Sequence, residues 1–379
     1  MKQLNTYTAL ALAGAIAFAG CAPIEPTANA SEAPLSQRVA ASTQLDGWQT
    51  FETEAFRGKR DALSFVDLDH GWYGTGAGDL FRTTDGGESW QKVASKPGTF
   101  VRSIAFIDRQ TGFIGNIGTD YYPGVTDETP LYRTDDGGAT WAAVDTGDST
   151  IKGVCAIDVI EVSRIYQGRL VPRMVIHAAG RVGGPTGILR SVDGGASWTV
   201  IDMSAHAKMI TDIAFRDENT GFVFGASNAN PQLSEGIVLR TDDGGKTWRE
   251  VYRSGRPGEI IWKGHFPSTA TGFGTVQSYD PNNAQQRVIR TRDGGESWQE
   301  LDLVENAQAR QFGIGFADEN TGFVGTMVGG FATRDGGESW TAVPIAPAAN
   351  KFQVVRGDAG GRVYAIGTQV QALDFTYAD

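Results

Sequence analysis

Residues 83–90 read Thr-Thr-Asp-Gly-Gly-Glu-Ser-Trp, and this eight-residue pattern decides the fold because it recurs along the chain. The other copies are residues 134–141, 191–198, 241–248, 291–298 and 333–340. Each copy has the form Ser/Thr-x-Asp-Gly-Gly-x-Ser/Thr-Trp, and successive closing tryptophans stand 42 to 57 residues apart. Such a period is typical of an architecture in which one small unit is built several times.

The residue types in the repeat indicate a hairpin turn. The aspartate can accept hydrogen bonds from the backbone amides that follow it, and paired glycines permit positive φ without a steric penalty. The tryptophan then begins the next strand with a large face to bury. No copy has the alternating oxygen ligands of a calcium loop, so we expect no metal. The residues interpreted as structural are Asp85, Asp136, Asp193, Asp243, Asp293, Asp335, Trp90, Trp141, Trp198, Trp248, Trp298 and Trp340.

A second pattern precedes most copies of the loop. It consists of an apolar strand ending in phenylalanine, a polar turn and another aromatic strand. The copies are residues 65–74, 106–115, 215–225, 266–275 and 316–325. Together the two patterns predict a four-stranded antiparallel sheet in each unit, and such sheets repeated radially make a β-propeller. In the third unit, residues 160–175 replace the turn with what we expect to be a longer hairpin.

The number of blades depends on the two ends of the repeat region. After Trp340 the chain supplies three more strands, within residues 351–375, but no seventh loop. Near the other end, residues 48–53 match the strand that follows each loop. We therefore expect an all-β, seven-bladed β-propeller of four-stranded antiparallel blades, with the ring closed by an N-terminal strand in the last blade. An irregular ring of six or eight blades is the alternative.

The start of the chain has the features of an export signal. Lys2 precedes an apolar stretch, residues 8–20, which is too short to span a bilayer. We expect a signal peptide at residues 1–20, a flexible tether at residues 21–45, and the propeller at residues 46–379.

The end of that signal, Phe18-Ala19-Gly20-Cys21, resembles the lipobox of bacterial lipoproteins, with Phe18 at the position of the usual leucine. The resemblance implies that Cys21 is lipidated and anchors the tether to a membrane. Ala22 follows the cysteine, which implies the periplasmic side of the outer membrane, or the thylakoid lumen in a cyanobacterium. An ordinary signal peptide is the alternative.

The recurring loop resembles the Asp-box, also called the bacterial neuraminidase repeat. Across residues 46–379 the chain is similar to the photosystem II assembly and stability factors and their bacterial relatives. That resemblance implies a non-catalytic propeller that binds a membrane-associated protein partner and needs no cofactor.

A competing resemblance is to sialidases and other Asp-box glycosidases. Before Trp90 the chain has only Phe-Arg-Gly-Lys-Arg-Asp, at residues 56–61, without the Ile-Pro typical of sialidases. A glycosidase needs two facing carboxylates, which 44 acidic residues can supply. An extracytoplasmic glycoside hydrolase or glycan-binding protein therefore stays open.

Charge and the rare residues exclude other classes of function. The net charge is -11 and no basic run occurs, which argues against nucleic acid as a partner. The four histidines show no metal-ligand spacing. Cys155 lies in an apolar segment and is interpreted as a small buried residue.

A functional surface is expected on the longer loops at the mouth of the channel, residues 115–130, 225–235, 252–264 and 275–287. Aromatic and charged residues there suit a protein or sugar interface. His265 stands where other units have a small residue, and Trp262 matches neither of the two repeated tryptophan positions. We therefore expect both side chains to face the channel. For His265, ordinary packing between blades is the alternative. The candidate residues are Tyr121, Tyr122, Arg256, Glu259, Trp262, Lys263, His265, Tyr279 and Asp280.

Overall fold

The structure, a computed structural model, describes residues 40–42, 44–147, 149–166 and 169–377. All of them belong to one unit, Pro34–Asp379, whereas the other unit, Met1–Ala33, lies outside the described residues. The predicted signal peptide, Cys21 and most of the predicted tether are therefore outside the described part of the chain. No helix among the described residues is long and apolar enough to cross a membrane.

The first four sheets follow one another along the chain and are here called blades 1 to 4. Blade 1 consists of β3 (Ala62–Phe65), β4 (Gly71–Gly74), β5 (Asp79–Thr83) and β6 (Gln91–Ser95). Blade 2 consists of β7 (Val101–Phe106), β8 (Gly112–Asn116), β9 (Leu131–Thr134) and β10 (Ala142–Ala143). Blade 3 consists of β11 (Ala156–Tyr166), β12 (Arg169–Gly180), β13 (Gly187–Ser191) and β14 (Thr199–Asp202). Blade 4 consists of β15 (Met209–Phe215), β16 (Gly221–Ala226), β17 (Gly236–Thr241) and β18 (Arg249–Arg253).

The remaining sheets, blades 5 to 7, complete the unit. Blade 5 consists of β19 (Glu259–His265), β20 (Gly272–Ser278), β21 (Gln285–Thr291) and β22 (Gln299–Glu305). Blade 6 consists of β23 (Gln311–Phe316), β24 (Gly322–Thr326), β25 (Gly329–Thr333) and β26 (Thr341–Val343). Blade 7 consists of β27 (Lys351–Arg356), β28 (Gly360–Ile366) and β29 (Val370–Tyr377), and β29 also pairs with β2 (Gln49–Phe51) and β1 (Ala40–Ser42). One 3-10 turn, η2 (Pro231–Leu233), is the helical element of the described part.

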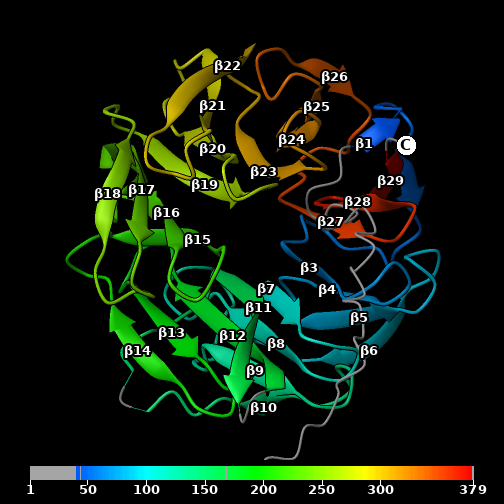
Figure 1. Cartoon of the computed structure of the whole chain (residues 1–379), viewed down its shortest axis with the longest axis vertical. Helices are drawn as coiled ribbons and strands as arrows, with labels where there is room; N and C mark the ends of the chain where they lie inside the picture. Colours follow the sequence, from blue (N-terminus) through cyan, green and yellow to red (C-terminus); the bar gives the residue numbers. More distant parts are fainter. Residues whose placement is uncertain (1–39, 43, 148, 167–168, 378–379) are drawn as a thin grey trace, which may run out of the picture. The chain divides into compact units, whose positions relative to one another are not determined.

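The innermost strands of neighbouring blades touch in cyclic order. Each of β3, β7, β11, β15, β19 and β23 contacts the innermost strand of the next blade, and β27 contacts β3. Figure 1 shows the blades of this unit arranged around a common centre. The predicted all-β class is confirmed, and seven antiparallel sheets in this arrangement are those of a β-propeller.

Aromatic rings pack the blades against one another. At five boundaries, an aromatic ring on the second strand of one blade stacks on the phenylalanine at or just after the end of the first strand of the next. Trp72 and Phe106, for example, have ring centroids 3.6 Å apart, and Trp141 meets the same Phe106 edge-on at 6.0 Å. The two sequence patterns therefore supply the interlocking faces of adjacent blades.

The Asp-Gly-Gly loops close each of blades 1 to 6 with the same hydrogen bonds. In blade 1, Asp85 accepts from the Thr83 hydroxyl at 2.6 Å, and from the Ser89 amide at 3.0 Å and hydroxyl at 2.5 Å. Gly86 and Gly87 have φ of 71° and 98°, which an L side chain rarely adopts. Hydrogen bonds from Ser89 and Thr83 lower the pKa of Asp85 to about 2. The aspartates are thus held as ionised hydrogen-bond acceptors of the turn.

Candidate functional site

A cavity of about 680 Å³ lies at the end of the ring where the chain enters the innermost strands, and it is here called the mouth cavity. Its walls come from the segments before β3, β7, β23 and β27 and from loops between second and third strands. Segments from several blades thus meet around one space, as expected at the mouth of a propeller.

The mouth cavity is lined by aromatic rings and cations. The aromatic residues are Phe56, Phe100, Tyr121, Tyr122, Trp262, Tyr279 and Phe312. The charged residues are Arg57, Lys59, Asp61, Arg102 and Arg310. Asp61 is thus the one carboxylate among the described lining residues, and it forms an ion pair with Lys59.

Several of these cations lie over aromatic faces. The Arg102 guanidinium is 5.3 Å from the ring centre of Trp262, and Lys59 Nζ is 5.0 Å from that of Phe312. Arg310 is 5.0 Å from the ring centre of Tyr279. Burial alone would raise the pKa of Asp61, but the positive charges of Lys59 and Arg102 hold it below its ordinary value. Asp61 is therefore ionised, and the lining keeps an excess of positive charge.

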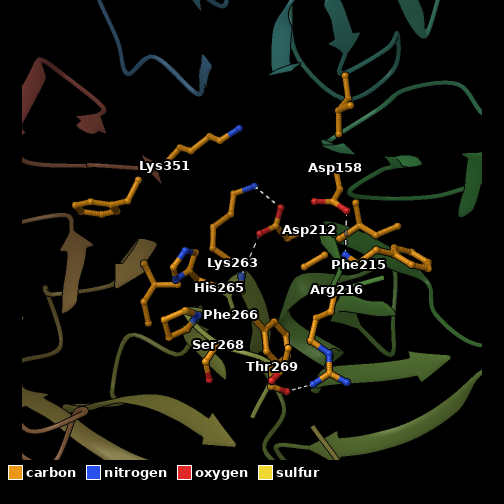
Figure 2. Close-up of a pocket in the computed structure, with 17 residues that line it drawn as sticks. Asp158, Asp212, Phe215, Arg216, Lys263, His265, Phe266, Ser268, Thr269 and Lys351 are labelled. Atoms are coloured by element: carbon orange, nitrogen blue, oxygen red, sulfur yellow. Dashed lines mark hydrogen bonds and ion pairs between the residues drawn. The ribbon is translucent and has the colours of Figure 1, made fainter. Parts of the chain in front are cut away.

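A second cavity, of about 430 Å³, is here called the base cavity. It lies among the ends of the innermost strands and the turns that follow them. Figure 2 shows Asp212 between Lys263 and Asp158, with Lys351 across the space. Lys263 Nζ donates to Asp212 at 3.1 Å. Burial raises the pKa of Asp158 to about 7 and lowers that of Lys351 to about 8.

Most of the polar side chains at the base tie one blade to the next. Asp158 accepts from the Phe215 amide at 2.9 Å, and Asp212 accepts from the Gly264 amide at 3.0 Å (Figure 2). His265 Nδ1 likewise accepts from the Phe316 amide at 3.2 Å, and burial lowers the pKa of His265 to about 4. His265, which stands where other blades have a small residue, thus joins blade 5 to blade 6 and also lines the base cavity.

The predicted site residues do not all lie together. Tyr121, Tyr122, Trp262 and Tyr279 meet in the mouth cavity, where Trp262 also donates through Nε1 to Asn350 Oδ1 at 2.8 Å. Lys263 and His265 line the base cavity instead. Asp280 lies in a shallow groove beside the mouth cavity, which shares Tyr279, Arg310 and Met327 with it.

Arg256 and Glu259 line neither cavity. Arg256 Nε donates to Glu259 at 2.8 Å, and its Nη2 donates to Glu300 at 2.8 Å. Tyr252 donates its hydroxyl to the same Glu300 at 2.7 Å. These residues form a polar network between blades 4 and 5.

Sequence reasoning missed Asp61, Arg102 and Phe312, although a signal was available. Each stands four residues before the phenylalanine that ends its innermost strand, which is also the position of Trp262. The corresponding residue of blade 4, Thr211, does not line the mouth cavity. Comparing this one position across blades would have pointed to Asp61, Arg102 and Phe312.

One cluster among the described residues has the geometry to hold a metal ion. Ligand atoms of Asp67, Asp69 and His70 lie within 4.8 Å of one another. His70 Nδ1 is 2.9 Å from Asp67, however, and the Arg109 guanidinium donates to the same carboxylate at 2.9 Å. The Asp67 carboxylate is thus already in contact with His70 and Arg109, and we assign no metal to this cluster.

No protein-family model matches the chain. Among curated proteins, it is 26% identical over 234 residues to the xyloglucanase Xgh74A of Acetivibrio thermocellus, covering 54% of this chain and 26% of the relative. A xyloglucanase of Paenibacillus sp is 37% identical over 90 residues, 19% of this chain and 9% of that enzyme. The matched region therefore spans about a quarter of the first relative and less of the second.

Solved structures share the fold at low sequence identity. YCF48 bound to D1 peptide has a TM-score of 0.59 and 15% identity, with coverage of 90% of this chain and 100% of that one. YCF48 from Cyanidioschyzon merolae has a TM-score of 0.59 and 13% identity, with coverage of 86% and 98%. A Niastella koreensis GH74 enzyme has a TM-score of 0.54 and 18% identity, and the match covers 82% of this chain and 51% of the enzyme. Fold and mouth cavity together define the class, a β-propeller with a concave site at the channel entrance.

Proposed function

We propose that this chain is a non-catalytic β-propeller that holds a segment of a protein partner at its mouth cavity and serves as an assembly factor for membrane-protein complexes. The lining of that cavity carries the proposal. Aromatic and arginine side chains dominate the energetics of protein interfaces, and here they surround one space. The similarity to YCF48 bound to D1 peptide supports a peptide-binding propeller.

The proposal includes attachment to a membrane through a lipid on Cys21, on the periplasmic side of the outer membrane or in a thylakoid lumen. Its support is the sequence Phe18-Ala19-Gly20-Cys21 and the apolar run before it. We expect Cys21→Ala to lose fatty-acid labelling, because this cysteine is the residue that would carry the acyl chains. Labelling of cells with a fatty acid, followed by capture of the protein, would check this. Equal labelling of the variant would contradict the anchor.

We also infer that the six loops are Asp-boxes and that the N-terminal strand β2 closes the ring. The shared hydrogen bonds of the loops support the first inference. The pairing of Gln49, Thr50 and Phe51 with β29 supports the second.

Affinity capture tests the proposed binding. The full chain and the double variant Tyr121→Ala/Tyr122→Ala would be cross-linked in membranes, and captured proteins identified by mass spectrometry. Both tyrosines are exposed, so their removal should leave the fold intact. We expect specific membrane proteins to be captured roughly tenfold less by the double variant. Val200→Ala, an exposed change on outer strand β14, is the control. Equal capture by the double variant would contradict the proposal.

The alternative is a glycoside hydrolase, which the xyloglucanase relatives and the paired aspartates of the base cavity favour. Asp158, with its raised pKa, and the ion-paired Asp212 provide an acid and a carboxylate. Both carboxylates, however, accept backbone amides across blade boundaries. Turnover of xyloglucan by the chain, lost in Asp158→Asn and Asp212→Asn, would establish the alternative; absence of turnover is expected.

A further inference from the structure

Arg102 differs from the other buried arginines of the described chain. Its side chain is 2% exposed, and neither terminal nitrogen, Nη1 nor Nη2, has a hydrogen-bond partner. The other buried arginines are Arg60, Arg181, Arg240 and Arg290. Each of those donates through a terminal nitrogen to a protein oxygen. Because a buried cation without hydrogen bonds is costly, Arg102 calls for an acceptor that the protein itself does not provide.

The protein groups around Arg102 do not fill that role. The Asp61 carboxylate attracts the guanidinium through space but forms its ion pair with Lys59. Trp262 offers the guanidinium an aromatic face, 5.3 Å from its ring centre, but Nη1 and Nη2 still have no hydrogen-bond acceptor. Arg102 also lines the mouth cavity, so its guanidinium borders the space that a bound group would occupy.

The charge of the cavity selects the sign of that group. Among the described residues, the cations Arg57, Lys59, Arg102 and Arg310 line the cavity with one carboxylate, Asp61, although the whole chain carries a net charge of -11. An acidic protein with a cationic cavity concentrates anions at that one place.

The shape and walls select its chemistry. A guanidinium presents paired donors in a plane, which match the two oxygens of a carboxylate. The aromatic walls suit an apolar or aromatic group, and about 680 Å³ is within the range of small-ligand sites. The groove that shares Tyr279, Arg310 and Met327 with the cavity gives a longer ligand a path outward.

We propose that the mouth cavity binds an organic carboxylate carried by an apolar or aromatic group, with Arg102 as its anchor. A free organic acid and the terminal carboxylate of a polypeptide share this chemistry. The proposal names the chemical group that the mouth cavity recognises. It rests on the proposed function only if that group is the terminal carboxylate of a polypeptide.

The test uses the full chain and matched small probes. Binding of 3-phenylpropionate, its neutral amide 3-phenylpropionamide, and inorganic phosphate is measured by calorimetry and by the shift in Tm. We expect the acid to bind and raise Tm, with the amide and phosphate at least roughly tenfold weaker. Equal binding of acid and amide, stronger binding of phosphate, or no binding of the acid would overturn the proposal.

Variants assign the anchor. Arg102→Gln should abolish binding of the acid, and Arg102→Lys should weaken it roughly tenfold because a lysine keeps the charge without the paired donors. The control is Arg253→Gln on outer strand β18, whose guanidinium is paired with Glu235 and Glu250. Binding by folded Arg102→Gln equal to that of the unchanged protein would overturn the assignment. Should Arg102→Gln fail to fold, the comparison of acid with amide still decides.

A peptide pair separates the two sources. A hexapeptide ending in phenylalanine is compared as the free acid and as the terminal amide. Tighter binding of the free-acid peptide than of 3-phenylpropionate supports a polypeptide end, and the reverse order supports a free organic acid. Equal binding of both peptide forms contradicts a polypeptide end. Partner capture that depends on Tyr121 and Tyr122 is independent of these results, so the proposed function and this inference can fail separately.

Discussion

His177 takes the place of an aromatic residue in the stack between blades 3 and 4. Its ring lies 3.6 Å from that of Phe215 and nearly parallel to it, and both ring nitrogens are buried without a partner. Burial lowers the pKa of His177 to about 3, with Arg190 as a further cause. The neutral imidazole therefore packs as an aromatic ring, and a charged one would not be tolerated.

Replacing His177 by phenylalanine should therefore stabilise the protein more at pH 5 than at pH 8. A depressed histidine pKa means that stability is full above the unfolded value of about 6.5 and falls as pH drops towards the folded value. At pH 5 the penalty removed is about 2 kcal/mol. Urea unfolding of both proteins at the two pH values measures it. His206→Gln, at an exposed site, is the control, and an equal gain at both pH values would contradict the explanation.

The mouth lining shows what could be predicted at single positions. Trp262 was identifiable because a bulky residue departed from the repeated pattern, and it does line the cavity. Arg102 was missed although it stands at the same repeated position as Trp262, and only the structure shows that its terminal nitrogens are buried and unpaired. Arg256 was predicted, like Trp262, as an aromatic or charged residue in a long loop, yet its guanidinium is bound to Glu259 and Glu300. Composition locates charged loops, whereas pairing decides which charges are free to bind.

Strands were predictable from the two recurring patterns, because one pattern forms the Asp-Gly-Gly turn and the other supplies the aromatic residues that pack neighbouring blades together. The longer hairpin expected at residues 160–175 is present as β11 and β12, whose register runs from Ala156 opposite Ala179 to Tyr166 opposite Arg169. Register shifts within the innermost pairs, such as that between Ile261 and Gly264, were not predictable. They change which side chains face the channel without changing the apolar pattern.

Trp48 directly precedes β2, the strand that pairs with β29 of blade 7. Its ring meets Phe352 edge-on at 6.2 Å and Phe323 at 5.1 Å. We expect Trp48→Ala to lower the free energy of unfolding by about 2 kcal/mol, less than for a fully buried tryptophan because Trp48 is partly exposed. Chemical denaturation measures this, and Trp48→Phe should lose less. Unchanged stability would show that blade 7 does not depend on the N-terminal segment.

The cyclic contacts of the innermost strands should make the whole unit unfold as one. In an open array of repeats, end units can fray, because each contacts one neighbour. Here β27 contacts β3, so each blade has two neighbours. We expect tryptophan fluorescence and far-ultraviolet circular dichroism to report the same urea midpoint. Separate midpoints would mean that part of the ring melts independently.

The pairing of Ala40 with Tyr377 has a consequence for how the gene could be rearranged. Because the two ends of the described chain lie on neighbouring strands, a short linker could join them, and the polypeptide could be opened instead at an exposed turn such as residues 204–206. The same blades would then be translated in a different order. The order in which the blades are synthesised could therefore change without changing the order in which they pack. We expect such a circular permutant to keep the contacts around the mouth cavity.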